Sequence, residues 1–195
     1  MLTPRMKLGL KILAGVAGVM VLAVVAILFV VPFSWVYPPP WVKWKKQNEC
    51  VRNLKGWFTA QKAFWQEHER YTVFVQELGF SPERGNRYAY FSGPGPVERR
   101  SLGREEATLR DTGFGVDTQK FEGGALSFDQ LPERVRREVG ISGQCPQCDI
   151  TLACLGQLDT DPTLDVWTVS TRDRTLEGEF VSAGQPYNEV RDEAL

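Results

Sequence analysis

The sequence predicts an α+β fold that follows an N-terminal transmembrane helix. Three observations lead to this prediction. Residues 12–31 are an uninterrupted apolar run of twenty residues. Residues 42–70 contain no proline and carry the apolar spacing of an amphipathic helix. Several short strand patterns follow that helix, so helix and strands are segregated along the chain, which is typical of α+β domains.

The apolar run has the length of a membrane-spanning helix. At about 1.5 Å per residue, residues 12–31 would extend roughly 30 Å, the thickness of the hydrocarbon core of a bilayer. Inside lipid a single segment must satisfy its own backbone hydrogen bonds, which requires a helix. A buried core helix is the alternative, but the run has no polar face. We therefore predict a transmembrane helix.

Basic residues around the run set the predicted orientation. The tail of residues 1–11 holds three basic residues and no acidic one, which favours a cytoplasmic N-terminus and a C-terminal domain on the far side. Lysines at positions 43, 45 and 46 follow the run closely and favour the opposite orientation. A cleaved signal peptide would have a shorter apolar region and a small-residue cleavage site, so a retained signal anchor is the preferred interpretation.

Residues 32–41 form a spacer rich in proline and aromatic side chains. Its three consecutive prolines, residues 38–40, prevent the membrane helix from continuing and favour an extended segment. Trp35, Tyr37 and Trp41 are expected at the membrane interface, where amphipathic aromatic rings accumulate.

Charge is segregated along the chain, which has 23 basic and 24 acidic residues. Residues 1–46 hold six of the basic residues and none of the acidic ones, so the remainder has 17 basic against 24 acidic residues. A mildly acidic domain argues against a nucleic-acid partner. The sequence contains no Walker loop, HExxH site or GxSxG elbow. We predict that the protein is not an enzyme.

The elements after the spacer are predicted in order from residue patterns. In residues 42–70, Val51, Leu54 and Phe58 lie on one helical face that would pack on a sheet, and Trp57, Phe64 and Trp65 widen this apolar stripe. Glycine, proline and asparagine predict a loop over residues 78–86. The remaining predictions are an aromatic strand at 87–92, an exposed excursion at 97–113, strands at 114–121, 151–157 and 166–171, a weaker strand at 125–128 and a short helix at 131–139.

The four cysteines are Cys50, Cys145, Cys148 and Cys154. An even number outside the cytoplasm indicates two disulfides, and three connectivities are possible. Pairing Cys50 with one of the others would close a loop of about a hundred residues and stabilise the fold by several kcal/mol.

The motif Cys145-Pro146-Gln147-Cys148 has other interpretations. It could be a thiol-redox pair or half of a four-cysteine zinc site, so a membrane-tethered thiol-redox or zinc-binding protein is the alternative function. A thioredoxin-like enzyme would place the motif at a helix N-terminus, whereas a glycine-rich stretch precedes it here. Structural disulfides are the preferred interpretation.

Asp159, Asp161 and Asp165 offer three carboxylates within seven residues, a composition that suits Ca²⁺. Their spacing is not that of an EF-hand loop, and Pro162 suits a turn that leads into a strand. Solvated turn carboxylates are therefore the alternative to a calcium site, and apart from possible calcium we predict no cofactor.

Two stretches of the domain resemble one family. The first lies in residues 50–92 and includes Ala60-Gln61-Lys62-Ala63-Phe64-Trp65 and Gly85-Asn86-Arg87-Tyr88-Ala89-Tyr90-Phe91. The second lies in residues 153–190 and includes Asp165-Val166-Trp167-Thr168-Val169-Ser170-Thr171 and Ala183-Gly184-Gln185-Pro186-Tyr187-Asn188. Together they resemble type IV pilin-like and pseudopilin-like proteins of the deltaproteobacterial kind.

The resemblance implies a pilin-like domain over residues 42–195, with a long helix packed on a small antiparallel β-sheet. It also implies a structural or accessory role in a type IV pilus, a type II secretion system or a related envelope system. The domain would be periplasmic and anchored in the bacterial inner membrane. Its partners would be membrane lipid and proteins of the assembly, including other copies of itself, and not nucleic acid.

The N-terminal part departs from the family pattern. Pilins carry a prepilin-peptidase site, a glycine followed by Phe-Thr-Leu-Ile-Glu or similar, at the head of one continuous helix. This sequence has no such site, no glutamate in or before residues 12–31, and prolines between its two predicted helices. In the family that glutamate helps to register subunits in the filament. We therefore expect a permanent anchor and a tethered accessory rather than a fibre subunit.

Overall fold

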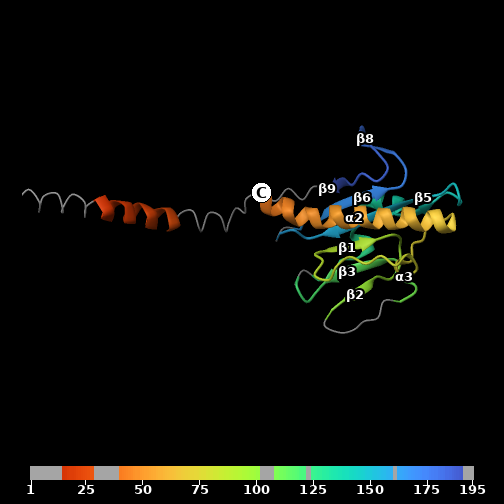
Figure 1. Ribbon diagram of the computed structural model, residues 1–195, viewed down its shortest axis with the longest axis horizontal. Coiled ribbons are helices and arrows are strands. Elements are labelled where there is room, and N and C mark those ends of the chain that lie inside the picture. The colour runs from red at the N-terminus through yellow and green to blue at the C-terminus, as the bar shows by residue number, and fades with distance from the viewer. Residues whose placement is uncertain (1–14, 29–39, 102–107, 122–123, 160–161, 191–195) are drawn as a thin grey trace, which may run out of the picture. The chain divides into compact units, whose positions relative to one another are not determined.

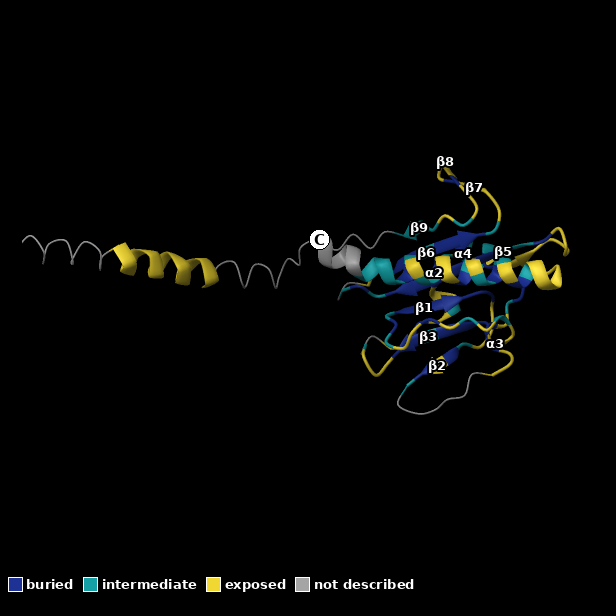
Figure 2. Cartoon of the chain, in the orientation of Figure 1, coloured by how far each residue is buried: buried dark blue, intermediate teal, exposed yellow. Residues whose placement is uncertain are grey.

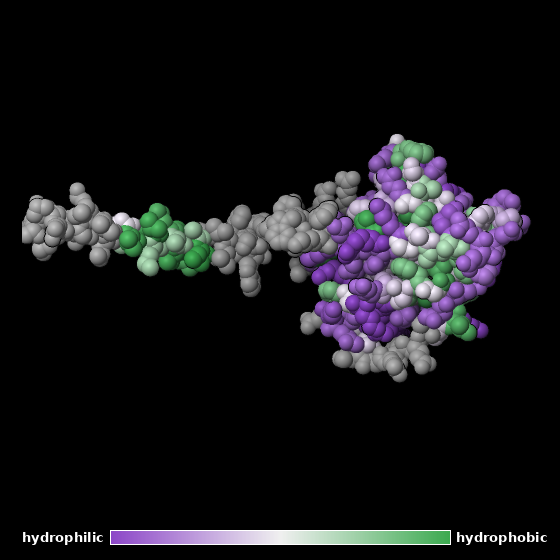
Figure 3. All heavy atoms as spheres, viewed as in Figure 1, coloured by the Kyte–Doolittle hydropathy of each residue, from purple (hydrophilic) through white to green (hydrophobic). Residues whose placement is uncertain are grey.

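The computed structural model describes residues 15–28, 40–101, 108–121, 124–159 and 162–190. The chain divides into two units, one up to Lys43 and one from Trp44 to Ala194. In the first unit residues 15–28 are helical and exposed, and Figure 3 shows their apolar surface. Within the described ranges no helix has both the length and the apolar character needed to cross a membrane. Positions 12–14 and 29–31 of the predicted span lie outside those ranges.

The long helix α2 (Pro40–His68) confirms the helix predicted over residues 42–70. Its buried side chains recur every three or four residues, and Figure 2 shows the resulting alternation of buried and exposed positions. These residues are Cys50, Leu54, Trp57, Gln61 and Phe64. Leu54, Trp57 and Phe64 of the predicted stripe are buried, whereas its other members, Val51, Phe58 and Trp65, are half-buried.

The main sheet has seven strands in the order β2-β3-β1-β5-β6-β9, with β4 pairing with β5 off this path. Its strands are β1 (Tyr88–Phe91), β2 (Glu98–Arg100), β3 (Gly113–Asp117), β4 (Gly140–Ser142), β5 (Asp149–Gly156), β6 (Asp165–Ser170) and β9 (Tyr187–Val190). The pair β2–β3 is parallel and the other pairs are antiparallel. A separate two-stranded sheet joins β7 (Arg174–Leu176) to β8 (Glu179–Val181).

Both faces of the sheet are covered, as alternate side chains of β1 illustrate. Tyr88 and Tyr90 lie in a core cluster with side chains of α2. Ala89 and Phe91 lie in a second cluster with Val135 of the short helix α4 (Glu133–Glu138). Figure 1 shows α2 running along the strands of the sheet. Burial on both faces explains why this strand is a continuous apolar run rather than an alternating one.

Several strand predictions are confirmed, and others are wrong. The strands at 87–92, 151–157 and 166–171 correspond to β1, β5 and β6. The strand predicted at 114–121 corresponds to the shorter β3, which begins one residue earlier and ends at Asp117. Residues 125–128 form no strand and instead lead into the 3-10 helix η1 (Phe128–Gln130).

The sheet is mostly antiparallel, as predicted, and differs from the prediction in the parallel pair β2–β3 and in its additional short strands. The excursion at 97–113 contains β2, and β4, β7, β8 and β9 were not expected from the sequence. Strands of three or four residues are too short to display a two-residue period, and β2 consists of charged residues. Their pairing depends on neighbours that are distant in the chain. The short helix α3 (Val75–Leu78) also precedes the predicted loop.

Candidate functional site

The structure determines the disulfide connectivity that the spacing of the cysteines left open. Cys50 of α2 is bonded to Cys154 of β5 across 104 residues of chain, and both are fully buried. Cys145 is bonded to Cys148 across the turn between β4 and β5. Two disulfides are therefore present, one between layers and one within a hairpin.

This arrangement does not suit a four-cysteine zinc site or a thioredoxin-like centre. Cys148 precedes β5 and Cys154 lies six residues further along, so strand geometry separates them by roughly 20 Å. A zinc ion binds its thiolates at about 2.3 Å and cannot bridge that distance. The Cys145–Cys148 turn also lies between two strands rather than at the start of a helix.

Asp165 accepts hydrogen bonds from four elements of the domain. Its side chain is fully buried at the start of β6. The donors are Gln47 Nε2 of α2 at 3.1 Å, Tyr88 Oη of β1 at 2.7 Å, Trp167 Nε1 of β6 at 2.6 Å and Asn188 Nδ2 of β9 at 3.1 Å. Burial, together with the nearby Asp165 carboxylate, raises the pKa of Tyr88 well above its usual range. This carboxylate therefore ties α2 to three strands.

The calcium prediction remains a prediction. Of its three residues, Asp161 lies outside the described residues and Asp159 is half-buried. Asp165 directs its oxygens at the four donors within the domain. Within the described part of the chain, no group of three or more histidine, cysteine, aspartate or glutamate residues could hold a metal ion.

The half-buried Glu49 forms a second polar contact between α2 and the start of β1. Its Oε1 accepts the backbone N–H of Arg87 at 2.8 Å and of Tyr88 at 3.4 Å, and the hydroxyl of Tyr90 at 3.3 Å. Burial raises the pKa of Glu49, although these hydrogen bonds act in the opposite direction. The sequence suggested a charge at the edge of the apolar stripe, and its contact with β1 was not foreseen.

Arg100 is a buried side chain that was not expected from the sequence. Its side chain is 1% exposed and donates to the carbonyl oxygen of Pro82 at 2.9 Å and to Asn86 Oδ1 at 2.9 Å. It also pairs with Glu98 at 3.3 Å. Residues 97–113 were expected to be exposed because they are rich in charge, so the burial of a guanidinium among them was not expected.

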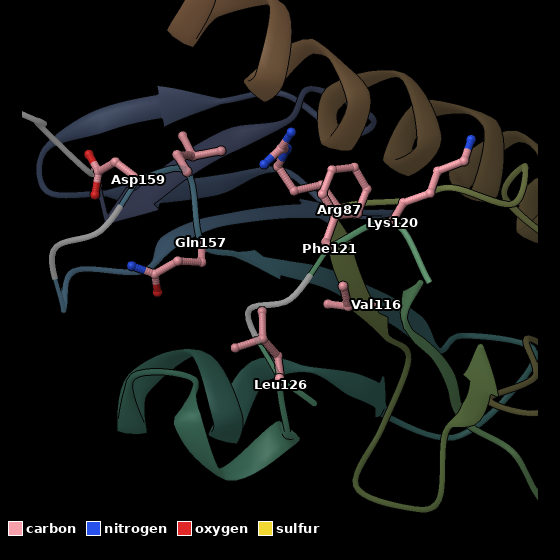
Figure 4. A pocket seen from close by; sticks show the side chains of 9 residues that line it. Arg87, Val116, Lys120, Phe121, Leu126, Gln157 and Asp159 are labelled. Carbon is pink, nitrogen blue, oxygen red and sulfur yellow. The ribbon is translucent and has the colours of Figure 1, made fainter. Parts of the chain in front are cut away.

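A pocket of about 390 Å³ opens at the ends of β1, β3 and β5 (Figure 4). Its apolar lining includes Val116, Phe121 and Leu126, and its basic side chains are Arg87 and Lys120. The Arg87 guanidinium lies 4.2 Å from the centre of the Phe121 ring. The lining also includes the carboxylate of Asp159, so the pocket offers apolar surface beside charges of both signs.

The predicted membrane-interface residues are not tested by the structure. Trp35 and Tyr37 lie outside the described residues. Trp41 belongs to α2, but its side chain is not described. Their interfacial role remains a prediction.

Comparison with known proteins identifies the family of this domain. The sequence model of the family described as Type IV pilin PilA matches residues 44–165, which is more than half of the chain. The chain belongs to the type IV pilin family. A Type IV major pilin protein PilA from Myxococcus xanthus (strain DK1622) is 31% identical over 175 residues, which cover 76% of this chain and 78% of the relative.

The region that matches the type IV pilin family coincides with the structural centre of the domain. It begins within α2 and ends at Asp165, so it includes both disulfides, Glu49 and the residues that line the pocket. As a type IV pilin, the protein is a pilin-like structural component, and the family points away from enzymatic activity.

Proposed function

We propose that this type IV pilin is a membrane-anchored, non-catalytic accessory of a type IV pilus or a related envelope system. Family membership supports the structural role. The description of its relative as a major pilin favours a pilus over type II secretion as the setting. The domain would lie in the periplasm, held at the inner membrane by residues 12–31, with the tail of residues 1–11 in the cytoplasm.

The observation that carries the accessory role is the run of three prolines at residues 38–40, between the apolar run and most of α2. Tyr37, Pro38 and Pro39 each precede a proline in the sequence, and that position disfavours helical backbone angles. We therefore expect the apolar run of residues 12–31 and α2 to be separate helices. In a continuous helix, the packing of the N-terminal part would fix the orientation of the globular domain. Two helices separated by prolines do not couple the anchor and the domain in this way, which suits a domain tethered to the membrane.

Fractionation of cells combined with mass spectrometry of the N-terminal peptide tests this proposal. We expect the chain in carbonate-washed inner membranes, with the peptide that contains Arg5 and Lys7 still attached to the apolar run. Recovery of a shorter chain, without that peptide, in fibres sheared from the cell surface would contradict the accessory role. The domain would then act as a fibre subunit.

A further inference from the structure

The two disulfides of the domain differ in the exposure of their cysteines. Cys50 and Cys154 are both fully buried between α2 and β5. Cys145 is exposed in the turn between β4 and β5, whereas its partner Cys148 is only 6% exposed. A thiolate breaks a disulfide by attacking one of its sulfur atoms directly, so access controls the reaction. In the folded domain only the Cys145–Cys148 bond has an exposed end.

The turn that carries Cys145 is uncharged and open to solvent. Every residue from 141 to 147 is exposed, and residues 140–148 include no charged side chain. Ile141 at the end of β4 is 40% exposed and adds apolar surface to the turn. An attacking thiolate is negatively charged, and this turn brings no carboxylate of its own to repel it. The thiolate of another protein can therefore approach Cys145.

Cys148 holds the other end of the bond in the core. It belongs to the same core cluster as Ile150 of β5. The residues that follow it are fixed from the end of β6, because the N–H of Ile150 donates to the Thr171 hydroxyl at 2.9 Å and this hydroxyl donates to Asp149 at 3.2 Å. None of these contacts involves the disulfide. Cys148 should therefore keep its place, next to Cys145, when the bond is opened.

Strand pairing closes the turn independently of the disulfide. The pairing of β4 with β5 runs in continuous register from Gly140 opposite Thr151 to Ser142 opposite Asp149. The bond spans a separation of 3 residues, so it constrains the unfolded chain less than the other disulfide, which spans 104. Opening the short-range bond should therefore leave the domain folded, with the long-range bond intact.

We propose that Cys145–Cys148 is a site of thiol–disulfide exchange with a protein that carries a reactive pair of thiols. The turn lies between strands and lacks the helix N-terminus that activates a catalytic cysteine, so this chain is the substrate of the exchange. Exchange here would convert the exposed turn between a closed disulfide and an open dithiol without unfolding the domain.

The exchange begins at the exposed sulfur. A thiolate of the partner attacks Cys145 Sγ, which forms a mixed disulfide and breaks the bond to Cys148, and Cys148 leaves as a thiolate that takes up a proton. The partner's second thiolate then attacks the partner's own sulfur in the mixed disulfide. Cys145 leaves as a thiolate and takes up a proton. Two electrons and two protons pass from the partner to this chain, and the reverse sequence oxidises it again.

Selective reduction of the full-length chain in detergent tests this proposal. The chain is treated with dithiothreitol under native conditions, and free thiols are alkylated at intervals and located by mass spectrometry. We expect alkylation of Cys145 and Cys148 to be at least about a hundredfold faster than that of Cys50 and Cys154, because the buried bond exchanges only when the domain opens. Circular dichroism should show a folded domain while the first pair is reduced.

A thioredoxin with a single active-site cysteine identifies the sulfur that is attacked. It lacks the second thiol that completes the exchange, so the mixed disulfide can be trapped by alkylation. We expect its cysteine to be bonded to Cys145, with Cys148 alkylated. The variant with Cys145→Ser and Cys148→Ser is the matched control, because it retains the buried disulfide and should form no adduct.

Three results would overturn the proposal. The first is reduction of both disulfides together as the domain unfolds, and the second is resistance of both to reduction in the folded chain. The third is an adduct at Cys148 or at the buried pair. None of these results bears on membrane attachment or N-terminal processing, so the inference goes beyond the proposed function and is tested separately from it.

Discussion

At the residue scale, two carboxylates, the fully buried Asp165 and the half-buried Glu49, connect the long helix to the sheet. A buried charge is tolerated only where hydrogen bonds replace the lost water. Asp165 accepts hydrogen bonds from side chains of α2, β1, β6 and β9. Glu49 accepts hydrogen bonds from the backbone N–H of Arg87 and from the hydroxyl of Tyr90. Each carboxylate therefore helps to fix the position of α2 on the strands. Apolar packing alone is less directional and would fix that position less precisely.

Replacing Asp165 should destabilise the domain strongly. Asp165→Ala leaves the donor groups of Tyr88, Trp167 and Asn188 without their acceptor in a buried site. We expect the free energy of unfolding to fall by about 3–5 kcal/mol. Urea denaturation measures this change. Asp129→Ala is the control, because its side chain is exposed, and it should cost less than about 0.5 kcal/mol. Equal losses in the two variants would refute the structural role of Asp165.

Glu49 should make stability depend on pH in a defined direction. Burial raises its pKa in the folded state, so the folded chain holds a proton more tightly than the unfolded chain. This contribution to the free energy of unfolding is fully present below the ordinary glutamate pKa. It is lost as pH rises through the raised pKa of Glu49.

Glu49→Gln removes this titration while keeping a carbonyl oxygen for the backbone N–H of Arg87. We expect a smaller decline in stability between acidic and neutral pH than in the native chain, measured by urea denaturation at a series of pH values. Glu67→Gln, with a side chain 76% exposed, is the matched control and should leave the decline unchanged. An identical pH profile for native chain and Glu49→Gln would count against this assignment.

At the scale of elements, α2 is held to the sheet by the Cys50–Cys154 disulfide as well as by apolar packing. The bond joins the buried face of the helix to the centre of the sheet, since β5 pairs with β1, β4 and β6. The Cys145–Cys148 bond closes a turn that the pair Ser142 and Asp149 already brings together. The two disulfides therefore make different contributions.

Removal of each disulfide should separate these contributions. In the chain-entropy relation a loop of about a hundred residues corresponds to roughly 4–5 kcal/mol, and a loop of a few residues to roughly 2 kcal/mol. We expect Cys50→Ser with Cys154→Ser to lower the free energy of unfolding more than Cys145→Ser with Cys148→Ser. Urea denaturation of both double variants measures the difference. A larger loss from the Cys145 and Cys148 pair would contradict this order.

At the scale of the whole molecule, the domain and the proposed anchor have separate roles. The folded domain carries the family match, both disulfides and the pocket. The apolar run of residues 12–31 carries the proposed attachment to the membrane. Changes in the run should therefore alter localisation and leave folding of the domain intact.

A charge in the middle of the run should weaken membrane attachment. Arginine at the centre of a membrane helix costs about 2.5–3.5 kcal/mol of insertion free energy. We expect Leu22→Arg to move a large part of the chain out of carbonate-washed membranes, whereas Leu22→Ala should stay. Immunoblotting of fractions measures the distribution, and urea denaturation should show an unchanged domain. Full retention of Leu22→Arg would argue against a spanning role for the run.

The parts of the fold that depend on local pattern were predictable. The period of apolar residues in α2 and the aromatic and β-branched runs of β1, β5 and β6 belong to continuous stretches of sequence. The family resemblance rested on those same stretches. By contrast β2, β4 and β9 are too short to have a period of their own, and they form strands because a longer strand lies beside them.

The sequence by itself determined that this protein has a long amphipathic helix ahead of strands, two cysteine pairs and a pilin-like domain. Only the tertiary structure decided which cysteines pair, that Asp165 is fully buried while Glu49 is half-buried, and that the ends of β1, β3 and β5 surround a pocket. The physical reason is distance along the chain. Helical period and strand propensity act within a few residues, whereas burial of a carboxylate or a disulfide depends on groups that folding brings together from a hundred residues away.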